Sequence, residues 1–416
     1  MSAADEPAGR WRRRLRRLVT LSAAVTGQLS QALISFSLQA VAARTLGASG
    51  LGTYALVYSV VITTSALSNG LVGDSLTVLD RGAGPVRAAL QRWALLGVGA
   101  ASVVTAVPLL SLGLLDLTST GIYILASASF MLEGLLRRLL MSGLRFWAVV
   151  AVDFSGLVAT VVTLVVAAAV GTITLDVMLL AMVAGQVLGG AVGVALLRPD
   201  ERWWATGPAD LRHVWGYGSW RAAQQLIRPT LLTLVRTLLV IEAGREAFGR
   251  LEAARIYVAP GLLVVQGLGS YLFASYARER TSALPVLVKR ADRTAVVMTS
   301  LTLTLGVVAT LLTHRLGPLI SGPSFSIEPA AVLGWAVFAA ATAANSPFSS
   351  LAAVRGQQRE VVVNALVIAL VTLVVATVVV LAGAPVATAP YVIGLGLLVQ
   401  AVQLRNRVLR RGDGLH

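Results

Sequence analysis

Long apolar runs limit what this chain can fold into more than any other feature of the sequence. An α-helix needs about 20 mainly apolar residues to cross the roughly 30 Å of hydrocarbon in a bilayer. Runs of this kind recur twelve times along the 416 residues. The predicted spans are 18–44, 51–73, 91–114, 119–141, 146–170, 175–197, 214–240, 248–275, 292–313, 329–352, 360–382 and 386–404. Hydrophobic residues make up 56% of the chain and charged residues 13%, which excludes an ordinary soluble protein and predicts an all-α polytopic membrane protein.

Basic residues indicate the side of the membrane on which each loop lies. The chain has 34 basic and 19 acidic residues, and cytoplasmic loops carry an excess of Lys and Arg. With the N-terminus in the cytoplasm, only Arg44, Arg245, Arg250 and Arg315 fall in outer loops. This bias predicts an even number of spans with both termini cytoplasmic, and a first span retained as a signal anchor behind the basic cluster at 10–17. Charge at the membrane edges predicts contact with anionic phospholipids rather than nucleic acid.

One sequence motif occurs twice, and its aligned glycines are 197 positions apart. Residues 42–56 read AARTLGASGLGTYAL, and residues 240–254 read VIEAGREAFGRLEAA. The aligned glycine pairs are Gly47 with Gly244 and Gly52 with Gly249. The same alignment continues backward through the preceding apolar helices. There it matches the polar residues Gln28 with Gln225, Gln31 with Arg228, and Gln39 with Arg236.

A weaker echo pairs residues 139–145 with residues 352–358, two short glycine-containing turns. Two echoes in chain order predict six spans per half, with the same orientation in each half. The predicted organisation is a basic N-terminus at 1–17, a six-helix bundle at 18–197, a cytoplasmic linker at 198–213, a second six-helix bundle at 214–404 and a basic tail at 405–416. Parallel repeats of this kind place a substrate site at the interface between the halves.

Polar side chains inside spans one and seven each fall on one helix face. In span one these residues are Gln28, Gln31 and Gln39, and in span seven they are Arg221, Gln225, Arg228 and Arg236. An arginine at the bilayer centre costs from about 2.5 to more than 10 kcal/mol. Arg228 lies near the centre of its span, so it faces a wet cavity or a buried partner. Arg221 and Arg236 lie nearer the ends and either line the same path or extend to the two membrane surfaces.

Acidic residues within the predicted spans are few. Glu133 lies one turn before an arginine, and Glu252 lies three residues before Arg255, so each can pair along its own helix. Asp153 begins span five near a group of arginines, and Asp74 closes span two near the inner face. Each of these four acids either forms an ion pair or carries a coupling proton.

Motifs for catalysis or cofactor binding are missing from the sequence. Cysteine is absent, the three histidines do not cluster, and no Walker loop or nucleophile elbow is present. We therefore expect no metal, no cofactor and no enzymatic activity.

The repeated motif resembles one found in polysaccharide and oligosaccharide-lipid flippases of the multidrug/oligosaccharidyl-lipid/polysaccharide exporter superfamily. Those proteins tend to show Ala-Arg, then Leu-Gly, then Gly with an aromatic residue. The matching residues here are Ala43-Arg44, Leu46-Gly47 and Gly52-Thr53-Tyr54, with a related pattern at Ala243-Gly244, Phe248-Gly249 and Ala253-Ala254-Arg255. Arg137-Arg138 followed by Gly143-Leu144-Arg145-Phe146 also resembles such proteins from high-GC bacteria.

The resemblance implies a twelve-helix, two-bundle fold that works by alternating access. It implies transport of a polyprenyl-diphosphate-linked oligosaccharide from the inner to the outer leaflet of a bacterial plasma (inner) membrane, for polysaccharide biosynthesis at the cell envelope. Glycosyltransferases or polymerases are the implied partners. Guanidinium groups bind phosphate through paired hydrogen bonds. The candidate headgroup ligands are Arg221, Arg228, Arg236 and Arg255, and the candidate ligands of sugar hydroxyls are Gln28, Gln31, Gln39 and Gln225.

Other functional classes stay open at this point. A drug or cation antiporter of the same superfamily needs buried acids to bind cations, and arginines in the middle of a span argue against a cationic substrate. A small-solute transporter of the major-facilitator class also has two parallel six-span halves, and residues 79–87 come near its loop motif, but the spacing differs and the usual earlier glycine is missing at Leu76. A membrane glycan ligase or polymerase needs catalytic groups in a large outer loop, and the longest outer loop, 314–328, holds few. A non-transporting partner of glycan-assembly enzymes also fits.

Overall fold

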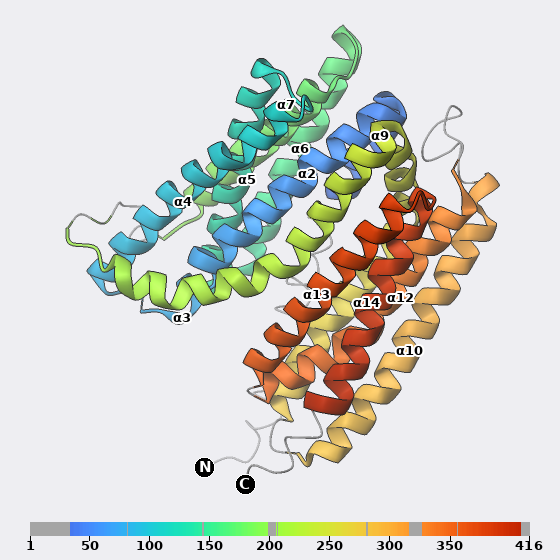
Figure 1. The fold of residues 1–416 in the computed structure, drawn as a ribbon. Coiled ribbons are helices and arrows are strands. Elements are labelled where there is room, and N and C mark those ends of the chain that lie inside the picture. The colour runs from blue at the N-terminus through green and yellow to red at the C-terminus, as the bar shows by residue number, and fades with distance from the viewer. Residues whose placement is uncertain are drawn as a thin grey trace, which may run out of the picture. The chain divides into compact units, whose positions relative to one another are not determined.

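The computed structural model describes residues 34–80, 82–143, 145–198, 205, 207–279, 282–315, 327–355 and 357–408, and these residues form helices and short connections without β-strands (Figure 1). Residues 34–45 are helical. The helices that follow are α2 (Gly47–Ser68), η1 (Asn69–Gly73, a π-helix), α3 (Ser75–Val78), α4 (Gly84–Ser111), α5 (Leu117–Ser142), α6 (Phe146–Val170), α7 (Leu175–Ala195), α9 (Leu211–Arg278), α10 (Leu284–Leu311), α12 (Pro329–Val354), α13 (Gln358–Leu381), η2 (Val386–Thr388), α14 (Ala389–Gln403) and η3 (Leu404–Val408). The predicted all-α fold class is confirmed.

Nine helical segments within the described residues are long and apolar enough to cross a membrane. They correspond to predicted spans two to six and nine to twelve. Predicted spans seven and eight form the two parts of α9, which bends at Gly244 (φ 85°, ψ 163°). Most of the first predicted span lies outside the described residues. The chain is therefore a multi-pass membrane protein whose two most polar spans meet at a glycine bend.

Local sequence explains where several helices begin. Asp116 accepts a hydrogen bond from the backbone N–H of Ser119 at 2.7 Å and caps α5. Thr174 accepts one from the backbone N–H of Val177 and caps α7. Proline occupies the first turn of α4, α10, α12 and α14, where its missing N–H leaves no hydrogen bond unmade. These capping residues and prolines define where the six helices begin and where the short connections before them end.

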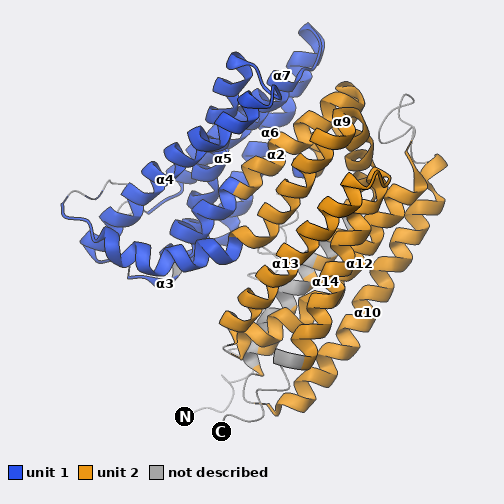
Figure 2. Ribbon diagram, viewed as in Figure 1, with its two compact units in different colours: residues 1–35, 64–225 blue, residues 36–63, 226–416 orange. Residues whose placement is uncertain are grey.

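The described residues divide into two compact units (Figure 2). Unit 1 comprises Met1–Ser35 and Thr64–Gln225, and unit 2 comprises Phe36–Thr63 and Leu226–His416. The boundaries fall inside α2 and α9, so they do not coincide with the predicted bundles at 18–197 and 214–404. That predicted division stays a prediction.

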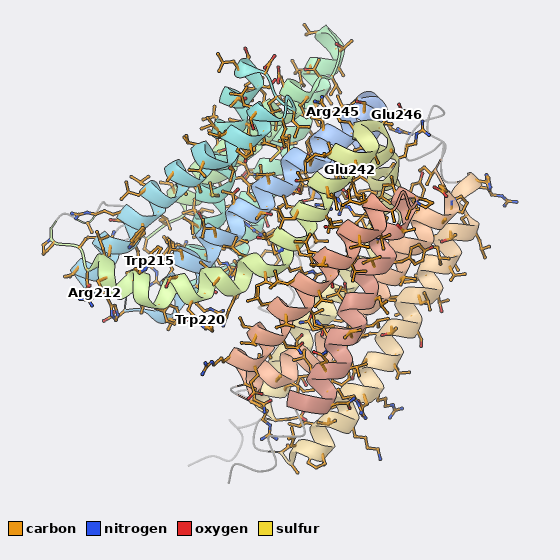
Figure 3. The ribbon with its side chains drawn as sticks, viewed as in Figure 1. Arg212, Trp215, Trp220, Glu242, Arg245 and Glu246 are labelled. Atoms are coloured by element: carbon orange, nitrogen blue, oxygen red, sulfur yellow. The ribbon has the colours of Figure 1, made fainter. Side chains whose placement is uncertain are left out.

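Unit 1 is built from α4, α5, α6 and α7, which pack side by side, with the end of α2, η1 and the start of α9 (Figure 2). One buried cluster joins Leu71 and Val72 of η1 to Leu90 of α4, Met131 of α5 and Val214 of α9. The first part of α9 carries two half-exposed tryptophans, Trp215 and Trp220, and Arg212 lies one turn before Trp215 (Figure 3). Exposed tryptophan and arginine together are typical of a membrane–water interface.

Unit 2 is built around α12, which contacts α10 and α14, while α13 packs on α14 (Figure 1). The outer face of α13 exposes Val363, Val367, Val371 and Val374. Exposed β-branched residues in a row of this length suit contact with lipid tails and not with water. The interior of unit 2 is the place where polar side chains need partners.

Both copies of the repeated motif lie in unit 2. Gly47 and Gly244, which the alignment pairs, both have positive φ, at 65° and 85°. Glycine adopts this conformation without the strain that a β-carbon causes. Each glycine therefore allows the chain to turn sharply before the helix that follows it.

Candidate functional site

Three polar residues gather around the buried carboxylate of Glu252 in unit 2, and we call the four residues Gln39, Arg236, Glu252 and Arg255 the Glu252 cluster. Glu252 is only 2% exposed. Its Oε1 accepts from Arg236 Nε at 3.1 Å, and its Oε2 accepts from Arg255 Nε at 2.6 Å. Arg255 also donates to Gln39 Oε1 at 2.7 Å. The cluster draws on the helix at 34–45 and on both parts of α9.

A tryptophan closes one side of the Glu252 cluster. The Arg255 guanidinium carbon lies 5.8 Å from the ring centre of Trp335 on α12, a distance that allows a cation–π interaction. The indole N–H of Trp335 donates to the backbone carbonyl of Leu251 at 2.9 Å. Glu252 thus neutralises one of two arginines, and the cluster keeps a net charge of +1.

Arg228 has different surroundings. It lies on α9 at the middle of the predicted span 214–240, and its side chain is exposed. Its NH2 donates to Thr342 Oγ1 at 3.3 Å, and its guanidinium carbon lies 5.6 Å from the ring centre of Phe338. Phe338 and Thr342 are one turn apart on α12, so they share a face. Among the residues that the structure describes, no carboxylate pairs with Arg228.

A second cluster surrounds one carboxylate in unit 1, and we call it the Asp74 cluster: Asp74, Arg138, Arg221 and Gln225. Arg221 Nε donates to Asp74 Oδ2 at 2.9 Å, and Arg221 NH2 lies 2.8 Å from the same oxygen. Gln225 Nε2 donates to the same oxygen at 2.8 Å. Arg138 NH1 lies 3.4 Å from Oδ1. One carboxylate therefore faces two guanidiniums, and this cluster also has a net charge of +1.

Small residues allow the Asp74 cluster to form. A β-carbon on Gly70 would collide with the backbone of Ala222, and one on Gly218 would collide with the carbonyl of Leu71. The backbones of η1 and of the first part of α9 are therefore in direct contact. The π-helical turn η1 ends directly before Asp74, and π-helical insertions occur often at functional sites.

A third charged group, which also lies in unit 1, has a net charge of the opposite sign. Arg137 Nε lies 2.7 Å from Asp153 Oδ1 and 3.6 Å from Glu133 Oε1. All three residues are buried, with Glu133 at 8%, Arg137 at 6% and Asp153 at 4% exposure. Two carboxylates share one guanidinium, so the fully ionised group has a net charge of −1. This arrangement favours an ion-pair role and leaves room for one proton.

The structure sorts the predicted site residues into these groups. Gln39, Arg236, Arg255 and Glu252 come together, Arg221, Gln225 and Asp74 come together, and Glu133 joins Asp153. Gln28 and Gln31 lie outside the described residues. The roles of all these residues in binding or coupling stay predictions.

Several residues in these groups escaped sequence reasoning. Phe338, Thr342 and Trp335 lie on an apolar span without charged residues, which gave no reason to single them out. The sequence singles out Arg138 only within the Arg137-Arg138 motif, and not as a partner of Asp74. The signal that points to Arg138 is its place beside Arg137 in α5, on the inner end of a span that also carries Glu133.

Comparison with known proteins reveals similarity at the level of fold. No protein-family profile matches the chain, and no curated protein sequence matches it. A structure described as the inward-facing conformation of a multidrug resistance MATE family transporter of the MOP superfamily is 13% identical, covers 94% of this chain and 98% of its own, and gives a TM-score of 0.72. The outward-facing conformation of a transporter of the same description is 14% identical, with 95% of each chain covered and a TM-score of 0.64.

A third solved structure comes from Pyrococcus furiosus. It is described as a MOP superfamily transporter in which reverse polarity of the binding pocket suggests a different function. It is 14% identical to this chain, covers 95% of it and 96% of its own length, and gives a TM-score of 0.63. Identities this low concern the fold and not the substrate. The chain therefore has the fold of MATE transporters of the MOP superfamily, as the motif resemblance implied.

Proposed function

We propose that this protein is a membrane transporter that works by alternating access and moves a polyprenyl-diphosphate-linked oligosaccharide from the inner to the outer leaflet. The fold, which it shares with solved transporters over nearly the whole chain, supports the transporter part of the proposal. The charge of the polar side chains supports the anionic substrate.

The single observation that carries the substrate class is Arg228. A guanidinium at mid-span is costly in hydrocarbon, and ion pairing with a carboxylate would offset that cost. The described residues provide Arg228 with a hydroxyl and an aromatic ring instead of an acid. An exposed cation in this position suits a water-filled path through which an anion passes.

The neighbours of Arg228 also suit phosphate binding. The Arg228 guanidinium carbon lies 5.6 Å from the ring centre of Phe338, and an aromatic ring leaves the guanidinium N–H groups to donate to an acceptor such as phosphate. Thr342 adds a hydroxyl at the same place. Gln39 uses its oxygen for Arg255, which leaves its amide N–H groups to donate to a sugar hydroxyl. Diphosphate and glycan are thus matched by different side chains.

A second candidate is export of a drug or small solute, which two of the solved structures favour by their descriptions. A cationic drug would meet the unpaired charge of Arg228, which opposes binding. A neutral or anionic solute meets no such obstacle. A third candidate, a non-transporting membrane partner of glycan-assembly enzymes, is distinguished from both by the absence of any transport.

The test is the level of polyprenyl-diphosphate-linked oligosaccharide on the cytoplasmic side of a deletion strain. The strain is complemented with wild type, with Arg228→Gln or with Arg250→Gln, a control on the exposed outer turn of α9. We expect the lipid-linked oligosaccharide to accumulate in the deletion strain. Wild type and Arg250→Gln should relieve this accumulation, and Arg228→Gln should not. Relief by Arg228→Gln at equal protein level would remove the anionic-headgroup role, and a deletion strain without accumulation would favour a small solute.

A further inference from the structure

The donors around Asp74 resemble the surroundings of a bound phosphate oxygen. Asp74 Oδ2 accepts one hydrogen bond from Arg221 Nε at 2.9 Å and one from Gln225 Nε2 at 2.8 Å, and Arg221 NH2 lies 2.8 Å from the same oxygen. Two guanidiniums face this one carboxylate, so the donors carry one positive charge more than Asp74 neutralises. Arg221 Nε and NH2 both lie within 2.9 Å of this one oxygen, and arginine binds phosphate oxygens through the same charged N–H groups.

The donors are also held in place beforehand. Gln224 Oε1 accepts from Arg221 NH1 at 2.7 Å, which orients the guanidinium toward Asp74. The buried Nε2 of the same Gln224 has no hydrogen-bond partner among the described residues. A buried N–H without a partner is costly, and an oxygen of a larger anion at this place would satisfy it.

The Asp74 cluster is open to small molecules on its basic side. The Arg221 and Arg138 side chains are 32% and 35% exposed, whereas that of Asp74 is 9% exposed. Arg221 directly follows Trp220, one of the exposed tryptophans at the start of α9 (Figure 3). With the predicted orientation, this position is the cytoplasmic membrane surface, where a lipid headgroup is first within reach.

We propose that the Asp74 cluster is a phosphate-binding site at the cytoplasmic end of the path, in which Asp74 occupies the place of the anion until a phosphate or diphosphate group displaces it. The site takes the headgroup of a lipid-linked diphosphate, and in this it rests on the proposed function. Arg221 forms the bidentate contact, Arg138 supplies the second charge, and Gln225 donates a neutral hydrogen bond. No covalent step is involved.

The displacement has a consequence that separates it from a structural ion pair. If Asp74 competes with the ligand, then Asp74→Asn removes the competitor and leaves both arginines to the anion. Binding should therefore become tighter, although a favourable ion pair has been lost. If Asp74 has a purely structural role, Asp74→Asn should lower the unfolding temperature, and any pyrophosphate binding by the variant should not depend on Arg221.

The experiment measures binding of radiolabelled inorganic pyrophosphate to the full-length protein in nanodiscs of neutral phosphatidylcholine. All variants carry Arg228→Gln, so that anion held at Arg228 does not contribute. We expect Asp74→Asn to bind pyrophosphate about tenfold more tightly than the parent, and Arg221→Gln added to it to lose about the same factor. Arg138→Gln, which changes a part-exposed side chain, should weaken binding severalfold without lowering the unfolding temperature. Arg250→Gln is the matched control and should change nothing.

Equal binding by the parent and Asp74→Asn, or binding that does not depend on Arg221 and Arg138, would overturn the proposal. Competition identifies the source of the phosphate: displacement by farnesyl diphosphate supports a lipid-linked diphosphate. Displacement by phosphatidylglycerol in the nanodiscs, but not by farnesyl diphosphate, would overturn that assignment. The measurement needs no transport and contains no Arg228, so the proposed function can fail in cells while this site stands, and the reverse also holds.

Discussion

Gly52 and Gly249 pack against each other so closely that neither position has room for a β-carbon. A β-carbon on Gly52 would collide with the carbonyl of Arg245, four residues before Gly249, and one on Gly249 would collide with the carbonyl of Ala48, four residues before Gly52. The two contacts are therefore reciprocal. Residues that the repeat makes equivalent meet each other across a pseudo-twofold relation.

The glycine contact predicts that Gly249→Ala destabilises the protein by about 1 to 3 kcal/mol, because an added methyl group forces two helix backbones apart. Thermal unfolding of the purified protein measures the effect. The control is Gly190→Ala in α7, where an added β-carbon has no heavy atom within 4 Å. Alanine there should be neutral or stabilise by about 0.5 to 1 kcal/mol. Equal unfolding temperatures for both variants would contradict a tight contact at Gly249.

Glu252→Gln should destabilise the protein by about 3 to 5 kcal/mol, because it leaves Arg236 and Arg255 without a counter-charge in a buried position. The two arginine side chains are only 13% and 19% exposed, so water compensates little. Glu246→Gln, which affects an exposed pair with Arg250, should change stability by less than about 1 kcal/mol. Denaturation midpoints for the two variants provide the comparison, and similar losses would argue against a special role for Glu252.

Arg137→Gln should be more harmful than Asp153→Asn. The first change leaves two buried carboxylates without a partner, whereas the second leaves Glu133 to balance Arg137 at 3.6 Å. We expect a loss of about 3 kcal/mol or more for Arg137→Gln and a clearly smaller loss for Asp153→Asn. The exposed pair Arg250–Glu246 provides a control, since Arg250→Gln should cost less than about 1 kcal/mol. The reverse order of the first two variants in unfolding experiments would show that Glu133 does not take over the pairing.

The surroundings of Arg228 should be wet. The chain contains no cysteine, so a single introduced thiol reports on its own position. Arg228→Cys should react with a charged, water-soluble methanethiosulfonate reagent. Val371→Cys is the matched control, because its side chain is 54% exposed on a face that suits lipid contact. It should react far more slowly, because a thiol in hydrocarbon is out of reach of the water-soluble reagent and does not ionise to the reactive thiolate. Equal rates at both positions would contradict a water-filled path at Arg228.

Much of the architecture follows from local sequence patterns. Hydropathy depends only on the composition of each segment, so nine predicted spans correspond to nine helices of the structure. The repeat could also be recognised in the sequence, because the chain has positive φ at both Gly47 and Gly244, a conformation that favours glycine. Even the pair Glu252–Arg255 follows from a three-residue spacing on one helix.

The partners of the polar residues did not follow from the sequence. Arg221 and Asp74 are 147 residues apart, and Arg228 and Thr342 are 114 residues apart. Helical periodicity places each residue on a face of its own helix, but it does not say which helix that face meets. The helical class, nine of the spans within the described residues and the repeated glycines followed from the sequence itself, while the cytoplasmic side of the arginines stays a prediction. Only the tertiary structure decided that Asp74 and Glu252 each face two arginines, whereas Arg228 has no carboxylate partner among the described residues. Helix rotation and register depend on close packing throughout each unit, which local sequence does not specify.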